Sequence, residues 1–151
     1  MITIRQANFL TDCFRDVAVD IQVILADVYT TAPWTFEQTF ADMLKEETTY
    51  FLAFSDEKMV GFLALSQIMD ETEITNIAVK QAYQGRGIAS LLLSQLAEFD
   101  GKIFLEVRKS NLSAQKLYKK FGFQVYHIRK NYYQNPPENA VLMKRSSQPN
   151  A

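Results

Sequence analysis

The spacing of apolar residues divides the chain into short strands and amphipathic helices. Apolar runs that alternate with polar residues, or are rich in β-branched side chains, predict strands; they are Ile2–Arg5, Tyr50–Ser55, Met59–Ile68, Glu73–Val79, Lys102–Arg108, Gln124–Tyr133 and Ala140–Lys144. Apolar residues that recur every three or four positions predict helices, and these segments are Phe14–Leu25, Thr35–Leu44, Ile88–Phe99 and Ala114–Phe121. This order predicts a mixed α/β domain around one sheet, with at least one parallel crossover.

Polar residues at the predicted helix starts suit the N-cap position, where a short side chain accepts a hydrogen bond from a free N–H of the first turn. The candidates are Thr11 or Asp12 for the first helix, Thr35 with Gln38 as a capping box for the second, and Ser110 or Asn111 for the last. Gly122 suits the C-terminal end of the last helix. The apolar stripe of the third helix is predicted to hold Ile88, Leu91, Leu92, Leu96 and Phe99.

The loop between the strand that ends at Val79 and the helix that starts at Ile88 contains Gln84–Gly87, with the sequence Gln-Gly-Arg-Gly. The first N–H groups of a helix have no partner within it, and the helix dipole places partial positive charge there. Glycines let a diphosphate approach the backbone closely, and Arg86 adds a formal charge. Two interpretations stay open from the spacing alone: a phosphate-binding loop, or a turn that needs two glycines for geometry. The spacing matches neither a Rossmann fingerprint nor a Walker loop.

Composition and charge narrow the classes of function. The chain has 151 residues, of which 48% are apolar and 22% charged, which is ordinary for one globular domain. We expect that domain to span residues 1–145, with a flexible polar tail over 146–151. A net charge of −1 favours neither nucleic acid nor an anionic membrane as a partner. One cysteine, Cys13, and one histidine make an internal disulfide and a metal site unexpected, and no signal peptide or membrane span is apparent, so a cytoplasmic location is expected.

Four polar residues are candidates for chemistry, and each also has a structural explanation. Glu106 lies within an apolar strand, and Glu73 begins the strand before the loop. An exposed strand face explains both, whereas burial would raise the pKa of either carboxyl group toward that of a general base. Tyr118 lies on the apolar face of its helix, where packing explains the ring, but its hydroxyl could protonate a leaving thiolate. Asn111 suits a helix cap, a ligand contact or both.

Residues 76–79 and 84–89, Asn-Ile-Ala-Val and Gln-Gly-Arg-Gly-Ile-Ala, resemble the acetyl-CoA signature of the GNAT acetyltransferase superfamily. The resemblance implies a mixed, mostly antiparallel central sheet with a parallel β-α-β core, flanked by helices. In that family the strand before the loop offers backbone groups to the pantetheine, and the loop amides hold the diphosphate. The implied acetyl-CoA contacts are Ile77, Ala78, Val79, Gln84, Gly85, Arg86, Gly87, Ile88 and Ala89.

Residues 105–111, Leu-Glu-Val-Arg-Lys-Ser-Asn, together with Tyr118, resemble one branch of this superfamily, the ribosomal-protein-alanine N-acetyltransferases. The similarity extends from about residue 33 to residue 143. It implies that Glu106 accepts a proton from the substrate amine, that Tyr118 donates one to the leaving group, and that Asn111 binds the cofactor.

Three residues or segments qualify this resemblance. Glu73 matches the position at which other GNAT lineages carry their base, so it stays the alternative to Glu106. The connection Glu98–Lys102 is several residues shorter than the branch usually has, and Asn139 stands where an aspartate is usual. Both departures lie in segments that could shape the choice of substrate.

The reaction that the resemblance implies is direct transfer of an acetyl group from acetyl-CoA, without a metal, to the N-terminal α-amine of a protein. A ribosomal protein that begins with alanine is the expected partner. At pH 7 an α-amine with a pKa near 8 is neutral about a tenth of the time and a lysine about once in 2,500, so a single carboxylate base suits the α-amine. Two other functions stay open: a GNAT enzyme that acetylates a small amine or antibiotic, and a non-catalytic acetyl-CoA-binding module.

Overall fold

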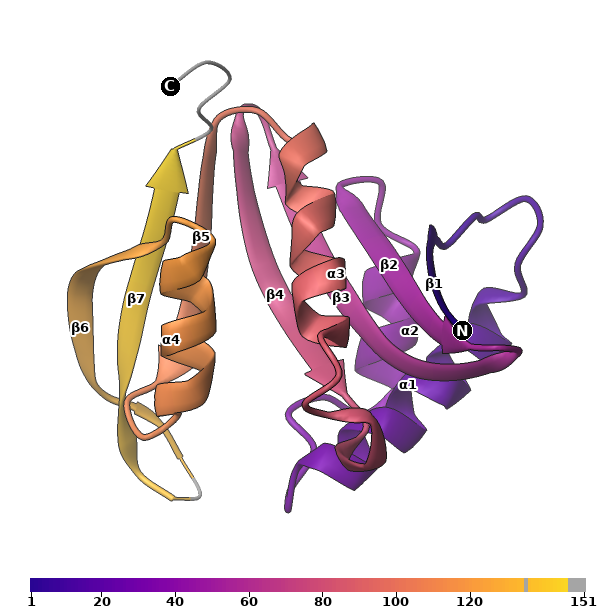
Figure 1. Cartoon of the computed structure of the whole chain (residues 1–151), viewed down its shortest axis with the longest axis horizontal. Coiled ribbons are helices and arrows are strands. Elements are labelled where there is room, and N and C mark those ends of the chain that lie inside the picture. The colour runs from indigo at the N-terminus through magenta and orange to yellow at the C-terminus, as the bar shows by residue number, and fades with distance from the viewer. Residues whose placement is uncertain (135, 147–151) are drawn as a thin grey trace.

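The structure, a computed structural model, describes residues 1–134 and 136–146, which form one sheet with helices on both faces (Figure 1). The strands are β1 (Ile2–Gln6), β2 (Thr48–Ser55), β3 (Lys58–Ile68), β4 (Glu71–Val79), β5 (Lys102–Arg108), β6 (Gln124–Tyr133) and β7 (Glu138–Ser146). The helices are α1 (Phe14–Val28), α2 (Phe36–Met43), α3 (Ile88–Ser94) and α4 (Leu112–Lys120), with short 3₁₀ turns η1 (Gln81–Tyr83) and η2 (Gln95–Glu98) on either side of α3. Of the predicted tail, Ser146 ends β7, and residues 147–151 lie outside the described part.

The sheet has the strand order β1-β2-β3-β4-β5-β7-β6. Its neighbouring strands are antiparallel except β4 and β5, which are parallel and are joined through α3. This arrangement confirms the predicted fold class, a mixed and mostly antiparallel sheet with a parallel β-α-β core.

Two of the predicted helix caps are confirmed, and one is wrong. Thr35 accepts a hydrogen bond from the Gln38 amide and the Gln38 side chain accepts one from the Thr35 amide, which completes the capping box. Asn111 caps α4. The N-cap of α1 is Cys13, which makes no side-chain cap, rather than Thr11 or Asp12. The Asp12 carboxylate instead accepts two hydrogen bonds from the Arg5 guanidinium, at 2.8 and 2.9 Å, so pairing with an arginine replaced the capping role.

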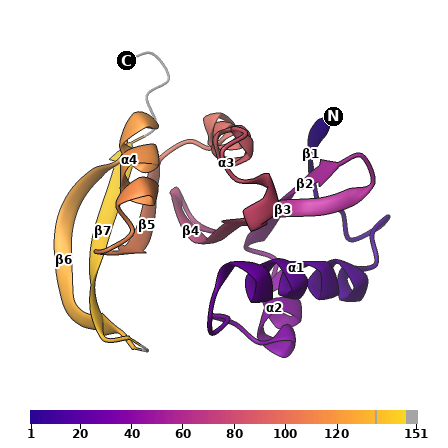
Figure 2. The same ribbon diagram turned by 60° about the horizontal axis from the view of Figure 1, so that its bottom comes forward.

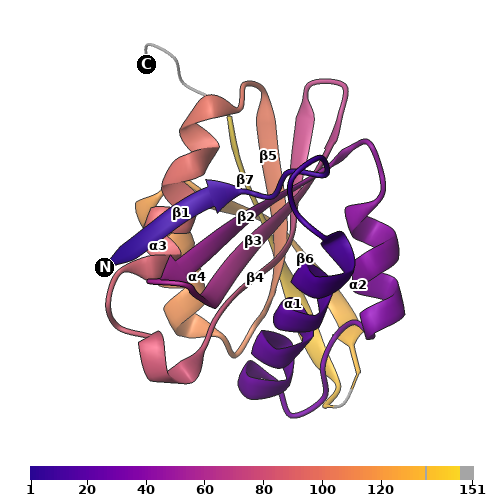
Figure 3. The same cartoon turned by 90° about the vertical axis from the view of Figure 1, so that its right-hand side faces the viewer.

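Two apolar cores lie on opposite faces of the sheet, because successive strand residues point to opposite sides. α3 and α4 cover one face, and α1 and α2 cover the other (Figures 2 and 3). On β3, Leu63 packs into the α3 core and Phe62 into the α1 core. The predicted stripe of α3 needs one correction. Leu91 is 45% exposed and Leu93 is fully buried in its place. The face of α3 that packs on the sheet is formed by Ile88, Leu92 and Leu93.

β4 and β5 pair only at their first residues. Glu71, Thr72 and Glu73 face Lys102, Ile103 and Phe104 in register, although β4 continues to Val79 and β5 to Arg108. Beyond this short junction the two strands diverge toward the loops that follow them (Figure 1). The sheet therefore consists of two parts, β1–β4 and β5–β7.

Gly101 lies at the start of this junction. Its φ is +86°, and a Cβ built there would lie 1.8 Å from the carbonyl oxygen of Asp70, the residue before β4. The short connection from α3 to β5 therefore packs directly against the β3–β4 turn. None of the helices in the described part of the chain is long and apolar enough to cross a membrane.

Candidate active site

A hollow of about 250 Å³ lies at the loop between β4 and α3. Gly85 and Gly87 line it with φ of +80° and +81°, and a Cβ at either position would meet no atom within 4 Å. The other lining residues are Val79, Tyr83, Gln84, Ile88, Ala89, Ser90 and Leu117. The two glycines thus border open space, which fits a loop whose backbone accepts a ligand.

A cation and a hydrogen bond from a side chain lie in the loop before α3. The Arg86 guanidinium lies over the ring of Tyr83, 4.9 Å from its centroid, and Arg86 is exposed. Gln84 donates a hydrogen bond to the Val79 carbonyl at 2.9 Å and so ties the loop to the end of β4. Free amides, a nearby cation and absent side chains are the features that suit a diphosphate. Sequence reasoning had missed Tyr83 and Ser90, which carry no spacing signal.

The second half of β4 presents backbone groups where β5 has diverged. The Lys80 amide donates to the Val60 carbonyl on β3 at 2.8 Å. In an antiparallel pair every second residue directs its backbone N–H and C=O toward the same neighbouring strand, so those of Ala78 also point toward β3. The polar groups of Ile77 and Val79 then point the other way, toward β5. Of the three strand residues expected to contact acetyl-CoA, Ile77 presents its amide and carbonyl on that side and Val79 its amide, since the Val79 carbonyl accepts from Gln84. Ala78 buries its side chain in the α1 core.

The two candidate bases lie on the same face of the sheet, near each other. Glu73 is paired in register with Phe104, and Glu106 is two residues further along β5. Surrounding protein atoms raise the pKa of Glu73 above its ordinary value, and the negative charge of Glu106 raises it further. Glu106 Oε2 lies 3.4 Å from Arg129 Nη1, and its side chain is 25% exposed. The structure thus brings both carboxylates together and leaves the choice between them to experiment.

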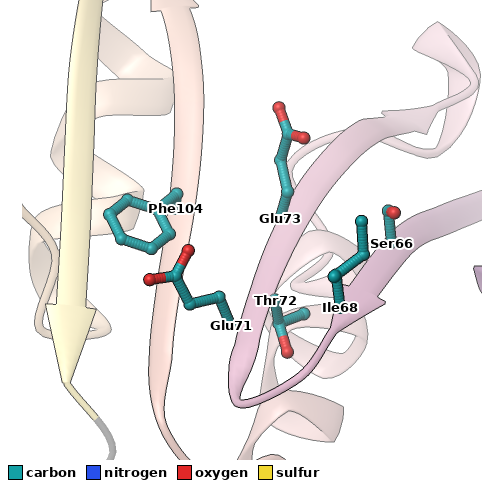
Figure 4. A pocket seen from close by; sticks show the side chains of 6 residues that line it. All are labelled: Ser66, Ile68, Glu71, Thr72, Glu73 and Phe104. Carbon is teal, nitrogen blue, oxygen red and sulfur yellow. The ribbon is translucent and has the colours of Figure 1, made fainter. Parts of the chain in front are cut away.

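A second hollow, of about 270 Å³, lies beside Glu73 (Figure 4). Its lining side chains come from β3, β4 and β5 and are Ser66, Ile68, Glu71, Thr72, Glu73 and Phe104. The hollow has both carboxylate and apolar walls, so a substrate held at Glu73 has room on this side.

Tyrosines from three parts of the chain come together beside these carboxylates. Burial raises the pKa of Tyr118, and the neighbouring Tyr29 and Tyr133 raise it further. Burial and then the charge of Glu106 raise the pKa of Tyr133 to about 12. Tyr133 therefore lies within electrostatic range of both Glu106 and Tyr118, although Tyr118 belongs to the α4 face. Tyr29, at the end of α1, was missed from sequence because only the fold brings it near Tyr118 and Tyr133.

Asn111 performs the structural role that its spacing allowed. Its Oδ1 accepts a hydrogen bond from the Ala114 amide at 3.2 Å and one from the Ser113 hydroxyl at 3.3 Å. α4 also supplies Leu117 to the hollow at the glycine loop. Asn111 thus lies at the start of a helix that borders the proposed cofactor site. No group of three or more His, Cys, Asp or Glu side chains in residues 1–134 and 136–146 is arranged to hold a metal ion.

The fold and this loop define a class of enzyme, and comparison with known proteins agrees. Residues 10–123 match the acetyltransferase (GNAT) family. The chain therefore belongs to the GNAT family and is an N-acetyltransferase. This family uses acetyl-CoA.

Within the family the chain is similar to enzymes named for ribosomal-protein acetylation. It is 39% identical to the [ribosomal protein bS18]-alanine N-acetyltransferase of Haemophilus influenzae over 120 residues, 74% of this chain and 80% of that protein. It is 32% identical to the N-alpha-acetyltransferase RimI of Mycobacterium tuberculosis over 142 residues, 90% of this chain and 87% of that protein. The crystal structure of the ribosomal-protein-S18-alanine N-acetyltransferase of Escherichia coli matches with a TM-score of 0.84 and 29% identity, over 97% of this chain and 94% of that one. The predicted branch resemblance is confirmed.

Proposed function

We propose that this enzyme transfers the acetyl group of acetyl-CoA to the N-terminal α-amine of a protein, with a ribosomal protein that begins with alanine as the acceptor. The observation that carries the proposal is that the glycine loop and the two candidate bases both lie near the point where β4 and β5 diverge. The glycine loop and α4 lie on one face of the sheet, and Glu73 and Glu106 lie on the other. Donor and acceptor can then meet from opposite faces. The names of the relatives support the ribosomal acceptor.

Each proton in the proposed reaction has a residue assigned to it. Glu106 accepts a proton from the ammonium group, directly or through water, so that the neutral nitrogen can attack the thioester carbon. As the C–N bond forms, the C–S bond breaks and Tyr118 donates its proton to the leaving sulfur. The excess proton on the nitrogen then restores Tyr118, the amide keeps its one N–H, and Glu106 releases the first proton to solvent. A tyrosine hydroxyl is protonated at neutral pH, and burial raises the pKa of Tyr118 further, so its proton is transferred only as negative charge develops on the sulfur. Acetyl-CoA supplies the activated acetyl group.

The need for only one base favours an α-amine over a lysine. Neutralising an α-amine at pH 7 costs about 1–1.5 kcal/mol, against about 4.6 kcal/mol for a lysine. Holding donor and acceptor together supplies much of the remaining acceleration.

The glycine loop gives the first prediction, that acetyl-CoA and CoA both stabilise the fold, since diphosphate contacts do not depend on the acetyl group. At about 100 times the dissociation constant, either ligand should add about 2.7 kcal/mol, or about 5–10 °C in a thermal-unfolding scan. Gly87→Glu should largely abolish this shift, because it places a side chain and a negative charge in the open space beside the loop.

Gly122→Glu is the matched control for the loop. Gly122 also has a positive φ, +92°, and a Cβ there would first meet the Arg145 side chain at 3.8 Å, at the C-terminal end of α4. The two variants therefore carry similar backbone strain and the same added charge. We expect Gly122→Glu to lose stability without losing the ligand shift. A normal shift in folded Gly87→Glu would remove the loop from the binding site.

The second prediction tests the acceptor. Three peptides are compared with acetyl-CoA by mass spectrometry: one with a free N-terminal alanine, the same peptide with a blocked N-terminus and a free internal lysine, and one with a bulky first residue. We expect the first to react at least about tenfold faster than the others, because its amine is more often neutral and its side chain is small. Equal rates on the blocked lysine peptide would contradict the N-terminal assignment. No reaction with any peptide would favour a small-amine acetyltransferase or a non-catalytic module.

A further inference from the structure

Arg108 belongs to the 105–111 motif and has no role in the proposed reaction, yet its side chain makes more polar contacts than those of its neighbours. It lies on β5, two residues after Glu106, and its side chain is 31% exposed. Its Nη1 donates to the Pro136 carbonyl at 3.0 Å and to Glu138 Oε1 at 3.2 Å, and its Nη2 donates to the Gln134 carbonyl at 3.0 Å. One guanidinium therefore contacts the connection between β6 and β7 at Gln134 and Pro136, and the first residue of β7.

The same guanidinium also packs on an aromatic ring of the site. Its central carbon lies 4.4 Å from the centroid of the Tyr133 ring, and the charge of Arg108 lowers the pKa of Tyr133 against the larger effect of burial. The charge of Glu106 raises the pKa of Tyr133, and Tyr133 raises the pKa of Tyr118, so Tyr133 is near both residues. A planar guanidinium can stack and donate a fork of hydrogen bonds at once, whereas a lysine ammonium cannot.

Glu138 connects this arrangement to the start of α4. While Oε1 accepts from Arg108, Oε2 accepts from the Ser110 amide at 2.6 Å. These hydrogen bonds and the Arg108 charge hold the pKa of Glu138 below its ordinary value, so the carboxylate stays charged at neutral pH. Asn139 adds two contacts, because its carbonyl accepts from the Lys109 amide at 3.1 Å and its Oδ1 accepts from the Asn131 amide at 2.9 Å.

We propose that Arg108 is a positioning residue that fastens the β6–β7 connection to the junction between β5 and α4, and thereby sets Tyr133 beside the acceptor amine. The inference rests on the proposed function, since it takes the space beside Tyr133 and Glu106 as the acceptor site. The same short segment, residues 106–111, then carries the base, the Arg108 anchor and the first cap of α4. Movement of the connection changes acceptor binding and leaves the glycine loop, on another part of the chain, unaffected.

The test is Arg108→Lys, which keeps the charge and loses the fork and the stack. We expect the KM for the alanine peptide to rise about tenfold, with kcat at saturating peptide and the KM for acetyl-CoA within about twofold of the unsubstituted enzyme. In the free enzyme, hydrogen exchange of the Lys109, Ser110 and Asn131 amides should become about tenfold faster, because their acceptors on Glu138 and Asn139 open β7 directly after the released connection. Glu138→Gln weakens the same contacts by changing the partner of Arg108. In the double variant, the rise in the peptide KM should be smaller than the two single-variant effects combined additively.

Arg145→Lys is the matched control. Arg145 also donates to a backbone carbonyl, that of Phe121 at 2.6 Å, and lies over an aromatic ring, Phe123, at 5.5 Å, but it joins β7 to the end of α4. It should leave the peptide KM and the three amides unchanged. Unchanged exchange of those amides in Arg108→Lys overturns the anchoring, and an equal rise in the KM for both substrates overturns the positioning role. No turnover by the unsubstituted enzyme with any peptide overturns the proposed function instead, while hydrogen exchange still decides the anchoring.

Discussion

Replacing Glu106 by glutamine is expected to lower turnover of the alanine peptide at least about 100-fold near pH 7, with little change in acetyl-CoA affinity. Glutamine keeps the shape of the side chain and loses its basicity. The deficit should shrink at higher pH. Because the free α-amine has a pKa near 8, its neutral fraction rises from about a tenth at pH 7 to about nine tenths at pH 9, so the variant should recover about tenfold over that range. The pH dependence of kcat/KM measures this directly.

Glu73→Gln is the comparison that decides between the two carboxylates. Glu73 lies on the same face as Glu106 and its pKa is raised partly by the Glu106 charge, so its removal changes the field at Glu106 but leaves that base in place. We expect a change in turnover of about threefold or less. The assignment of Glu106 is wrong if Glu73→Gln disables the reaction while Glu106→Gln leaves it intact; Glu73 would then be the base.

Gly101→Ala is expected to destabilise the protein by at least about 3 kcal/mol, which lowers the melting temperature by about 6–12 °C. The new methyl group would lie 1.8 Å from the Asp70 carbonyl oxygen, in a backbone with φ of +86°. That oxygen belongs to the main chain and has no rotamer by which to move away. Either the connection to β5 or the start of β4 must shift, so the short junction between the two strands should be weakened as well.

Gly85→Ala separates the strain of the backbone from the lack of space. Gly85 has nearly the same φ, +80°, but a Cβ there meets nothing within 4 Å. Gly85→Ala should destabilise the protein only by the strain of an alanine in the left-handed conformation, which is about 1–2 kcal/mol. Similar free energies of unfolding for the two variants, from chemical or thermal denaturation, would show that the contact with Asp70 adds nothing to the cost of Gly101→Ala.

The elements that could be predicted from sequence are those with a local cause. The strand Lys102–Arg108 was predicted with its observed bounds, because Ile103, Leu105 and Val107 recur at every second position and so share one face. The capping box of α2 was likewise found from the spacing of Thr35 and Gln38. Both signals depend on residues a few positions apart, where backbone geometry fixes which side chains meet.

The features that escaped prediction depend on contacts that are set by the path of the folded chain and not by local spacing. Asp12 suited a helix cap, but the fold placed Arg5 of β1 within reach of it. Tyr29 follows a helix without any motif, and its relation to Tyr118 and Tyr133 exists only once α1 and α4 pack on opposite faces. The roles of Glu106, Tyr118 and Asn111 came from resemblance to a family, and they stay predictions until the variants are measured.

The short junction between β4 and β5 has a consequence for the mechanics of the enzyme. Three residue pairs join the two parts of the sheet, so we expect the sheet to bend more readily at this junction than a fully paired sheet would. A donor bound between the diverging strands would bridge them and make one stiff body from two. We therefore expect the two parts of the sheet to move relative to each other about Gly101 in the unliganded enzyme. The acceptor site would then reach the geometry needed for acceptor binding only after the donor has bound. Such coupling would impose an order on the binding of the two substrates without any lid.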